Sequence, residues 1–281
     1  MRAYITLLST TNYLPGVISL ARSLQDVNAR FPLFVGLSAG VPAAIDAVLQ
    51  SKGMMTVRLA PESPLPRMPD QKHHHWTNTF DKLHLFGLTD FDKLVYLDSD
   101  MMILGNIDEL FEKPHMSAVA AGRLVHSDWT GLNSGLMVIE PRAGLPALIG
   151  KQLQPALNRA LKAGRTEVGD QDLLNEFYAN WPTQPGLHLD DGYNVFHYHT
   201  DAYIEAHNYA LPSTDQADSS NNCKPIKVMH FVGRVKPWMA QAVAKHALGT
   251  FKPNRAPWER QAFVMYRKLL AKAKRPTFAE A

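Results

Sequence analysis

The chain of 281 residues is 46% hydrophobic and 20% charged, which is ordinary for a globular protein and sufficient for one large core. No apolar run reaches the roughly 18 residues that cross a bilayer, and we expect the N-terminal segment to be a first strand and not a signal peptide. The single cysteine, Cys223, excludes an internal disulfide and favours a reducing, cytoplasmic compartment.

The net charge of +3 is unevenly distributed along the chain. Residues 251–281 carry eight Lys or Arg and two Glu, a sum of +6, so the other 250 residues sum to −3. A basic tail on a mildly acidic body argues against a general nucleic-acid binder and predicts a local electrostatic patch.

The first 60 residues alternate between strand-like and helix-like patterns. Short apolar runs predict strands at 3–9, 31–38 and 54–60. Between them, apolar residues at helical spacing predict helices at 14–24 and 41–53. This alternation is typical of a largely parallel sheet that is covered by helices.

The proline-rich segment 61–78 is too long for a simple connector, and we expect it to cover part of the molecule. After it, periodicity predicts further strands at 93–98, 116–122, 131–141 and 226–233, and helices at 79–88, 145–164, 170–181 and 257–275. The sequence therefore predicts one α/β domain with a mostly parallel central sheet over residues 1–250, followed by a basic helical tail at 251–281.

The predicted tail helix has an apolar face and a basic face. Trp258, Ala262, Met265 and Leu269 recur at helical spacing, and Lys and Arg residues lie between them. One interpretation is a helix that packs on the domain and leaves its basic face in solvent. The other is peripheral docking on the anionic inner surface of a membrane, where each basic residue adds up to about 1 kcal/mol of binding free energy.

Asp98 and Asp100 stand at the end of the predicted strand 93–98, the edge at which open α/β sheets bind ligands. A lone Asp-x-Asp is more often a turn or a helix cap, and a histidine such as His230 at a strand end is more often structural. Two carboxylates and one imidazole on separate segments together suit a divalent cation. Mixed oxygen and nitrogen ligands favour Mn²⁺ over Ca²⁺, with Mg²⁺ as an alternative.

Gly233 and Lys236 follow the last predicted strand and suit a diphosphate, because the glycine allows close approach and the lysine supplies a point charge. No G-x-G-x-x-G follows a strand, and no P-loop signature is present. Met102 stands where a phosphatase of the haloacid dehalogenase type needs Thr or Ser. A metal and diphosphate site without those motifs points to a nucleotide-sugar.

Several blocks occur in a familiar order: LLSTTNYLPGVISLARSL, TFDKLH, YLDSDMMILGNIDELF, LNSGLMVI, GDQDLLN, DGYNV and HFVGRVKPW. In this order and spacing the chain resembles glycosyltransferase family 8, the retaining enzymes of the glycogenin and galactinol synthase group. The resemblance spans residues 3 to about 240. It implies a GT-A fold, a UDP-sugar donor and a catalytic Mn²⁺, and we expect the transferred hexose to be glucose or galactose.

The resemblance also implies roles for individual residues. Leu7, Ser9, Thr10 and Tyr13 match the segment that holds the uridine, with Tyr13 stacking on the base. The other matches are Lys82 facing the donor, Asp98, Ser99 and Asp100 in the metal and ribose motif, Asn133 and Ser134 at the donor sugar, Asp170 and Gln171 under its anomeric carbon, and His230, Gly233 and Lys236 in the metal and diphosphate cluster. Asp170, Gln171 and Lys236 are thus the expected catalytic residues.

Two positions depart from the family pattern. The arginine of the covering loop falls on His73, with Lys72 as the nearest cation. Asp201 falls at the position of the self-glycosylated tyrosine of glycogenin, so we expect a separate carbohydrate, polyol or glycoconjugate acceptor. Whether the protein is a homodimer stays open.

Two other functions compete with hexose transfer. Sugar-phosphate nucleotidyl transfer also uses an α/β fold and paired aspartates, but it usually has a glycine-rich N-terminal signature where this chain reads LLSTTNYLPG. A non-catalytic nucleotide-sugar-binding protein would be favoured by a broken metal cluster. All three proposed ligands are present in the sequence.

Overall fold

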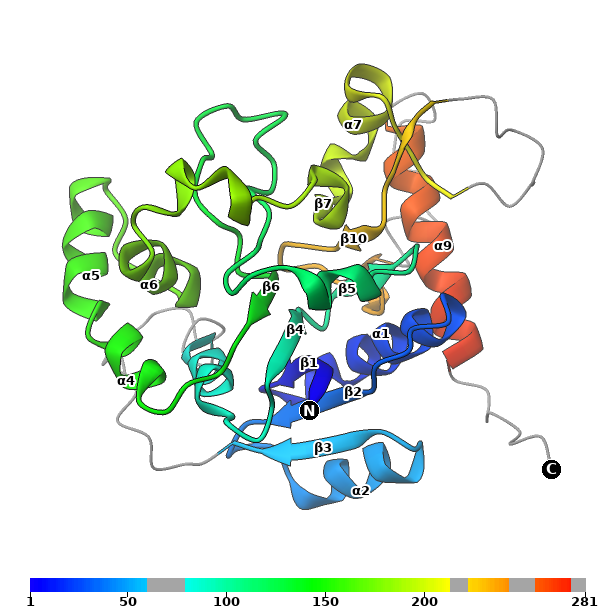
Figure 1. Cartoon of the computed structure of the whole chain (residues 1–281). Helices are drawn as coiled ribbons and strands as arrows, with labels where there is room; N and C mark the ends of the chain where they lie inside the picture. Colours follow the sequence, from blue (N-terminus) through cyan, green and yellow to red (C-terminus); the bar gives the residue numbers. More distant parts are fainter. Residues whose placement is uncertain (60–78, 213–221, 243–255, 274–281) are drawn as a thin grey trace.

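The protein has a mixed α/β fold built on a mostly parallel sheet (Figure 1). The computed structural model describes residues 1–59, 79–212, 222–242 and 256–273. The central sheet has the strand order β3-β2-β1-β4-β6, with β1 at Arg2–Leu8, β2 at Leu33–Leu37, β3 at Met55–Arg58, β4 at Lys93–Leu97 and β6 at Leu136–Ile139. The pairs β3-β2, β2-β1 and β1-β4 are parallel, and β6 runs antiparallel to β4.

Two small sheets extend this framework. The first has the order β5-β10-β7, formed by Met101–Ile103, Val228–His230 and Val195–Phe196. The second pairs β8 with β9, formed by Tyr209–Ala210 and Lys224–Pro225. Because β10 pairs with β5 in the Asp100–Ile103 region, the strand that ends at His230 lies beside the segment that follows Asp98.

The helices cover both faces of the sheet. The α-helices are α1 at Leu14–Asp26, α2 at Ala43–Ser51, α4 at Leu145–Gly150, α5 at Leu153–Lys162, α6 at Asp170–Phe177, α7 at Thr200–His207 and α9 at Pro257–Ala273. The 3-10 helices are at Thr11–Tyr13, Thr79–Gly87, Asp108–Glu112, Trp181–Thr183, Pro185–Leu187, Asp191–Tyr193 and His197–His199. In Figure 1, α4, α5 and α6 group on the opposite side of the molecule from α7 and α9.

Successive side chains along a strand point to opposite faces of the sheet, so the core forms one layer on each face. Ala3, Ile5 and Leu7 point to the layer that contains α4 and α6, whereas Tyr4 points to the layer that contains α1. All four side chains are buried, so β1 is covered on both faces, as expected for a parallel strand between helices.

The predicted helix 79–88 is a 3-10 helix at Thr79–Gly87, and two other predicted elements differ further from the structure. The segment 116–122 is not a strand, because Met116 has a positive φ of 63° and a turn starts at Ala120, which leaves only isolated bridges at Ala118. The predicted helix 145–164 is interrupted between α4 and α5. Pro155, in the first turn of α5, has no N–H to donate to a carbonyl one turn earlier, so the helix cannot continue through this point.

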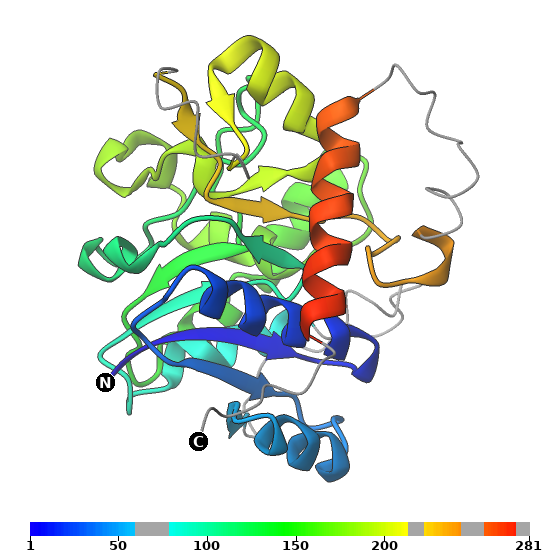
Figure 2. The ribbon, with the colours of Figure 1, turned by 90° about the vertical axis from the view of Figure 1, so that its right-hand side faces the viewer.

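The predicted tail helix is α9, and it packs on the body of the protein. Figures 1 and 2 show α9 beside α1, although the two come from opposite ends of the described chain. Phe263, Tyr266 and Leu269 are buried in one cluster with Phe231. The side chains of Arg267 and Lys268 are exposed on the other face of the helix.

Replacing Tyr266 by Ala should destabilise the protein by about 3–5 kcal/mol, because a fully buried ring would leave a cavity. The ring centroid of Tyr266 lies 4.8 Å from that of Phe231 and 6.0 Å from that of Trp238. Urea unfolding measures the change, with Val264→Ala as the control, since Val264 is 44% exposed on the same helix. Equal midpoints for the two variants would contradict the packing role of α9.

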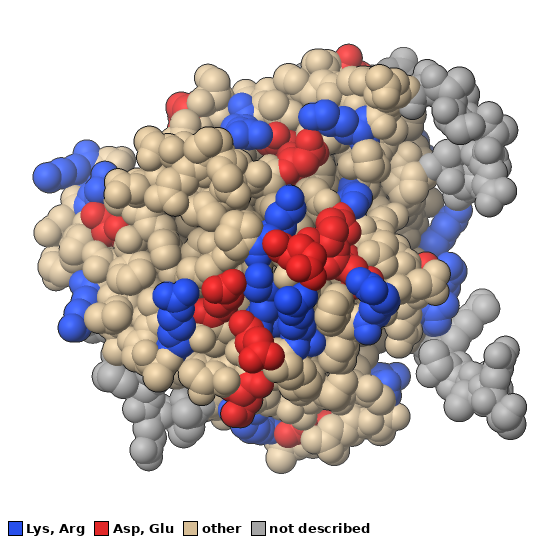
Figure 3. All heavy atoms as spheres, viewed as in Figure 1, with Lys and Arg blue, Asp and Glu red and all other residues tan. Residues whose placement is uncertain are grey.

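Basic and acidic side chains are interspersed on the face shown in Figure 3. Lys227 forms an ion pair with Glu109, Lys224 pairs with Asp190 at 3.0 Å, and Arg123 pairs with Asp191 at 2.7 Å. Among the described residues, no helix combines the length and the apolar character that crossing a membrane requires.

Candidate active site

A large pocket opens at the carboxyl ends of β1 and β4, where the strand order reverses direction around β1. Its volume is about 1140 Å³. Every residue for which the family resemblance implied a role lines it: Leu7, Ser9, Thr10, Tyr13, Lys82, Asp98, Ser99, Asp100, Asn133, Ser134, Asp170, Gln171, His230, Gly233 and Lys236. The fold therefore brings all of these positions together, while their individual roles stay predictions.

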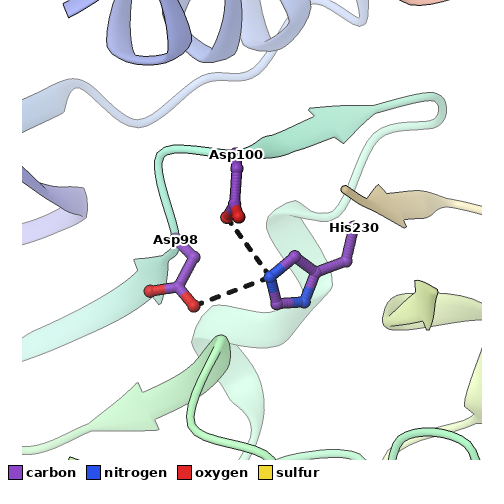
Figure 4. A group of neighbouring side chains, drawn as sticks. All are labelled: Asp98, Asp100 and His230. Atoms are coloured by element: carbon purple, nitrogen blue, oxygen red, sulfur yellow. Dashed lines mark ion pairs between the residues drawn. The ribbon is translucent and has the colours of Figure 1, made fainter. Parts of the chain in front are cut away.

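Asp98, Asp100 and His230 converge on one point of this pocket (Figure 4). The Nε2 atom of His230 lies 3.2 Å from Oδ1 of Asp100 and 3.7 Å from Oδ2 of Asp98. One ligand atom from each residue can be chosen so that all three lie within 4.8 Å of one another. Two carboxylate oxygens and an imidazole nitrogen at this spacing fit a divalent cation.

A hydrogen bond with Asn194 orients His230, and Asn133 in turn holds Asn194. Its Nδ1 atom lies 2.9 Å from Oδ1 of Asn194, and the amide of Asn194 donates to Oδ1 of Asn133 at 2.8 Å. Asn194 is fully buried, so it is a structural partner of the proposed ligand. Gly135 makes room for the ring, because a Cβ atom there would lie 2.6 Å from Cε1 of His230.

Lys236 adds a positive charge next to the aspartates. Its Nζ atom is 2.5 Å from Oδ2 of Asp100 and donates to the carbonyl of Phe231 at 3.0 Å. Burial acts to raise the pKa of Asp100, but His230 and Lys236 outweigh it and hold the pKa well below its usual value. Asp100 is therefore ionised, as a metal ligand must be.

Asp98 is in a different electrostatic environment. Burial raises its pKa, and the nearby charge of Asp100 adds to this, while Lys82 and His230 only partly offset them. A cation at this point would favour the ionised form of Asp98, so this half-buried carboxyl also fits a metal site.

Lys82 links the metal motif to the first turn of α6. Its Nζ atom lies 2.7 Å from Oδ2 of Asp170 and 3.2 Å from Oδ1 of Asp98. It also donates to the carbonyl of Ser134 at 3.2 Å. Burial acts to lower the pKa of Lys82, but the two carboxylates raise it above its usual value, so the side chain is a buried cation.

Gln171 lines the pocket and contacts the Asn133 segment. Its Oε1 atom accepts from the amide of Asn133 at 2.8 Å and from the backbone N–H of Ser134 at 3.2 Å. Asp170 and Gln171 occupy the first turn of α6, where the helix dipole favours negative charge. The amide of Gln171 is a poor nucleophile, and the carboxylate of Asp170 is already paired with Lys82.

The loop from β1 to α1 forms another wall. Tyr13 contacts Trp238 edge-to-face with centroids 5.7 Å apart, and the Nζ atom of Lys236 lies 5.8 Å from the Tyr13 ring. Trp238 itself donates its Nε1–H to the carbonyl of Asn12 at 3.0 Å and does not line the pocket. Trp238 thus supports the wall from behind.

Some pocket residues were not singled out from the sequence. Among them are Arg165, Asp172 and Arg234. Arg165 forms an ion pair of 2.7 Å with Asp172, which lies two residues after Asp170 in α6. Arg234 could have been found, because it directly follows Gly233 in the quoted block HFVGRVKPW.

Two predictions concern other parts of the chain. The covering segment 61–78, with Lys72 and His73, lies outside the described residues. Asp201 accepts hydrogen bonds from the backbone N–H groups of Trp258 and Glu259, each at 3.1 Å, at the start of α9. At the position of the glycogenin acceptor tyrosine, this chain therefore has a helix-capping carboxylate.

Comparisons with known proteins agree with this geometry. The family model for Glycosyl transferase family 8 matches residues 4–242. Human glycogenin-1 is 29% identical over 241 residues, which cover 84% of this chain and 62% of glycogenin-1. Galactinol synthase 7 of Arabidopsis thaliana is 31% identical over 112 residues, which cover 40% of this chain and 34% of that protein. The chain thus spans less than two thirds of the length of these relatives.

A solved structure of the galactosyltransferase LgtC in complex with donor and acceptor sugar analogs has the same fold, with a TM-score of 0.61 and 18% sequence identity. The match covers 98% of this chain and 97% of that one. The fold is therefore the GT-A fold of such glycosyltransferases. With the family model matching most of its length, this chain belongs to glycosyl transferase family 8.

Proposed function

We propose that the protein is a retaining hexosyltransferase that takes glucose or galactose from a UDP-sugar in the presence of Mn²⁺. The observation that carries the proposal is the convergence of Asp98, Asp100 and His230 beside Lys236 in one pocket of a family 8 chain. The acceptor is a carbohydrate, a polyol or a glycoconjugate distinct from the chain itself.

The pocket walls suit the parts of such a donor. Tyr13 lines the pocket and would stack on a uracil, and Ser9 and Thr10 are hydroxyl-bearing neighbours at the end of β1. A divalent cation held by Asp98, Asp100 and His230 would neutralise the diphosphate and make UDP a better leaving group. Lys236 would pair with the same diphosphate.

The groups around the sugar favour front-face attack. Asp170 is paired with Lys82 and can orient sugar hydroxyls. The side-chain oxygen Oε1 of Gln171 can stabilise positive charge at the anomeric carbon. As the glycosidic bond to the diphosphate oxygen breaks, the acceptor oxygen bonds to the same face of the anomeric carbon. The acceptor proton then passes to the departing diphosphate, so the α configuration of the donor is kept.

UDP, UDP-glucose and UDP-galactose should raise the melting temperature of the protein when Mn²⁺ is present and much less when it is absent. The reason is that a ligand that binds only the folded state stabilises it by mass action. A thermal-shift panel with MnCl₂ or EDTA measures this, with ADP-glucose as the control for the base. Absence of any shift by all UDP compounds would remove the donor assignment.

Nucleotidyl transfer on a sugar phosphate is the alternative enzyme class. It would consume UTP and a sugar 1-phosphate and release diphosphate, whereas hexose transfer consumes a UDP-sugar and releases UDP. A protein that binds UDP-sugars but releases no UDP with any acceptor would be the non-catalytic binding protein.

A further inference from the structure

Two exposed aromatic side chains come together on the surface near the pocket. Trp129 is 40% exposed and Tyr198 is 45% exposed, and they are the exposed Trp and Tyr side chains in the described part of the chain. His126 stacks on Trp129 with centroids 4.2 Å apart and an interplanar angle of 25°. The ring of His199 lies between this stacked pair and Tyr198. Its centroid is 5.2 Å from that of His126 and 4.4 Å from that of Tyr198. We call His126, Trp129, Tyr198 and His199 the aromatic platform.

The platform adjoins the metal side of the pocket through one buried ring. The centroid of Phe196 lies 6.4 Å from that of Trp129, 5.8 Å from that of His199 and 5.6 Å from that of His230. A single phenyl ring thus separates the platform from a residue of the proposed metal site.

The platform also adjoins the side of the pocket that holds Gln171. Trp129 precedes Asn133 by four residues, and Leu132 between them is fixed to α6. The Asn175 side chain accepts from the N–H of Leu132 and donates to its carbonyl, each at 2.9 Å, and it donates to the carbonyl of Gln171 at 2.9 Å. The platform therefore flanks the end of the pocket at which Gln171 and His230 stand.

The local backbone provides space for the platform. Gly122 has a φ of +88°, and a Cβ atom there would lie 2.6 Å from the indole of Trp129. The backbone N–H of Trp129 donates to the carbonyl of His126 at 2.9 Å. This turn brings the two stacked rings together. His199 is 6% exposed, and its Nδ1 atom has no hydrogen-bond partner among the described residues. The platform thus presents the exposed rings of Trp129 and Tyr198, while His199 packs beneath them.

We propose that the aromatic platform binds the acceptor, and that the acceptor presents a pyranose ring that stacks on Trp129. The axial C–H groups of a pyranose form an apolar face that matches an indole, while its hydroxyls need polar neighbours of the kind that the exposed Tyr198 supplies. This inference rests on the proposed function, because it places the acceptor next to the end of the pocket where the donor hexose would react.

Saturation-transfer NMR on the full-length protein tests the proposal, with UDP and Mn²⁺ present and with maltose, lactose and the acyclic polyol sorbitol as probes. The wild-type protein should transfer saturation to the ring protons of maltose or lactose and not to sorbitol. Trp129→Ala should weaken binding of that disaccharide about five- to tenfold, the loss expected for one stacked aromatic contact. Trp129→Phe should retain most of the binding.

The control is Leu161→Ala, which removes an apolar side chain that is 59% exposed on α5. It should bind the disaccharide like the wild type. Trp129→Ala should keep the thermal shift caused by UDP and Mn²⁺, since the platform is not part of the proposed donor site.

The outcomes separate this inference from the proposed function. If the wild type shows no UDP response, the proposed function fails. If it responds to UDP but binds neither disaccharide, binds sorbitol equally, or binds sugar unchanged in Trp129→Ala, the platform assignment is wrong. A dimer in sedimentation velocity that Trp129→Ala alone dissociates would show that the platform is instead an interface between copies of the chain.

Discussion

Asp100→Asn should reduce the rate of UDP release from the donor about 100- to 1000-fold while the protein stays folded. Asp100 is the carboxylate that both His230 and Lys236 approach, at 3.2 Å and 2.5 Å. The substitution removes one negative charge from the proposed metal site, and charge stabilisation of a leaving group is typically worth several kcal/mol. Turnover is measured as UDP formed in the presence of Mn²⁺, and folding by circular dichroism.

Matched variants sharpen this test. Asp98→Asn and His230→Ala should cause losses of similar size, because each removes a ligand atom from the same cluster. Asp90→Asn changes an exposed carboxylate outside the pocket and should leave the rate unchanged. Wild-type turnover in all three ligand variants under EDTA would show that the cluster holds no catalytic metal.

Lys82→Met should destabilise the protein by about 3–5 kcal/mol and also abolish activity. The side chain of Lys82 is buried and pairs with both Asp98 and Asp170, so its loss leaves the buried Asp170 and the half-buried Asp98 without their cation. Urea unfolding at neutral pH with EDTA measures the stability without any contribution from a bound metal.

A double variant distinguishes lost pairing from lost packing. Asp170→Asn combined with Lys82→Met should be less destabilising than the sum of the two single substitutions, because the double variant leaves one fewer unpaired charge. Additive losses, or a Lys82→Met variant as stable as the wild type, would mean that the Lys82 pairs contribute nothing to stability.

The architecture could be predicted because the spacing of apolar residues changes clearly between the pattern of a strand and the pattern of a helix. The strand at 93–98 is a continuous apolar run that ends in Asp98, and the helix at 14–24 has a clear apolar face. The carboxyl ends of parallel strands meet at one edge, so the blocks that follow those strands had to converge. The structure confirms the fold and gathers the predicted residues in one pocket.

Features that depend on long-range contacts could not be predicted in this way. The short strands β5 and β7 exist because each pairs with β10, and two or three residues carry no period of their own. From the sequence alone, Asn194 could equally be a packing residue. Its role as the partner of His230 depends on a hydrogen bond between residues 36 positions apart. Trp129 and Tyr198 are far apart in sequence, and only the ring contacts of His199 and Phe196 unite them.

The stereochemistry of donor cleavage tests the central claim most directly, and it needs no known acceptor. Water can replace the acceptor, so slow hydrolysis of UDP-glucose or UDP-galactose with Mn²⁺ reports which face of the anomeric carbon is attacked. We predict that proton NMR taken before mutarotation shows the α-hexose as the first product, and that Asp100→Asn forms none. A β-hexose as the first product would contradict the retaining reaction proposed for this pocket.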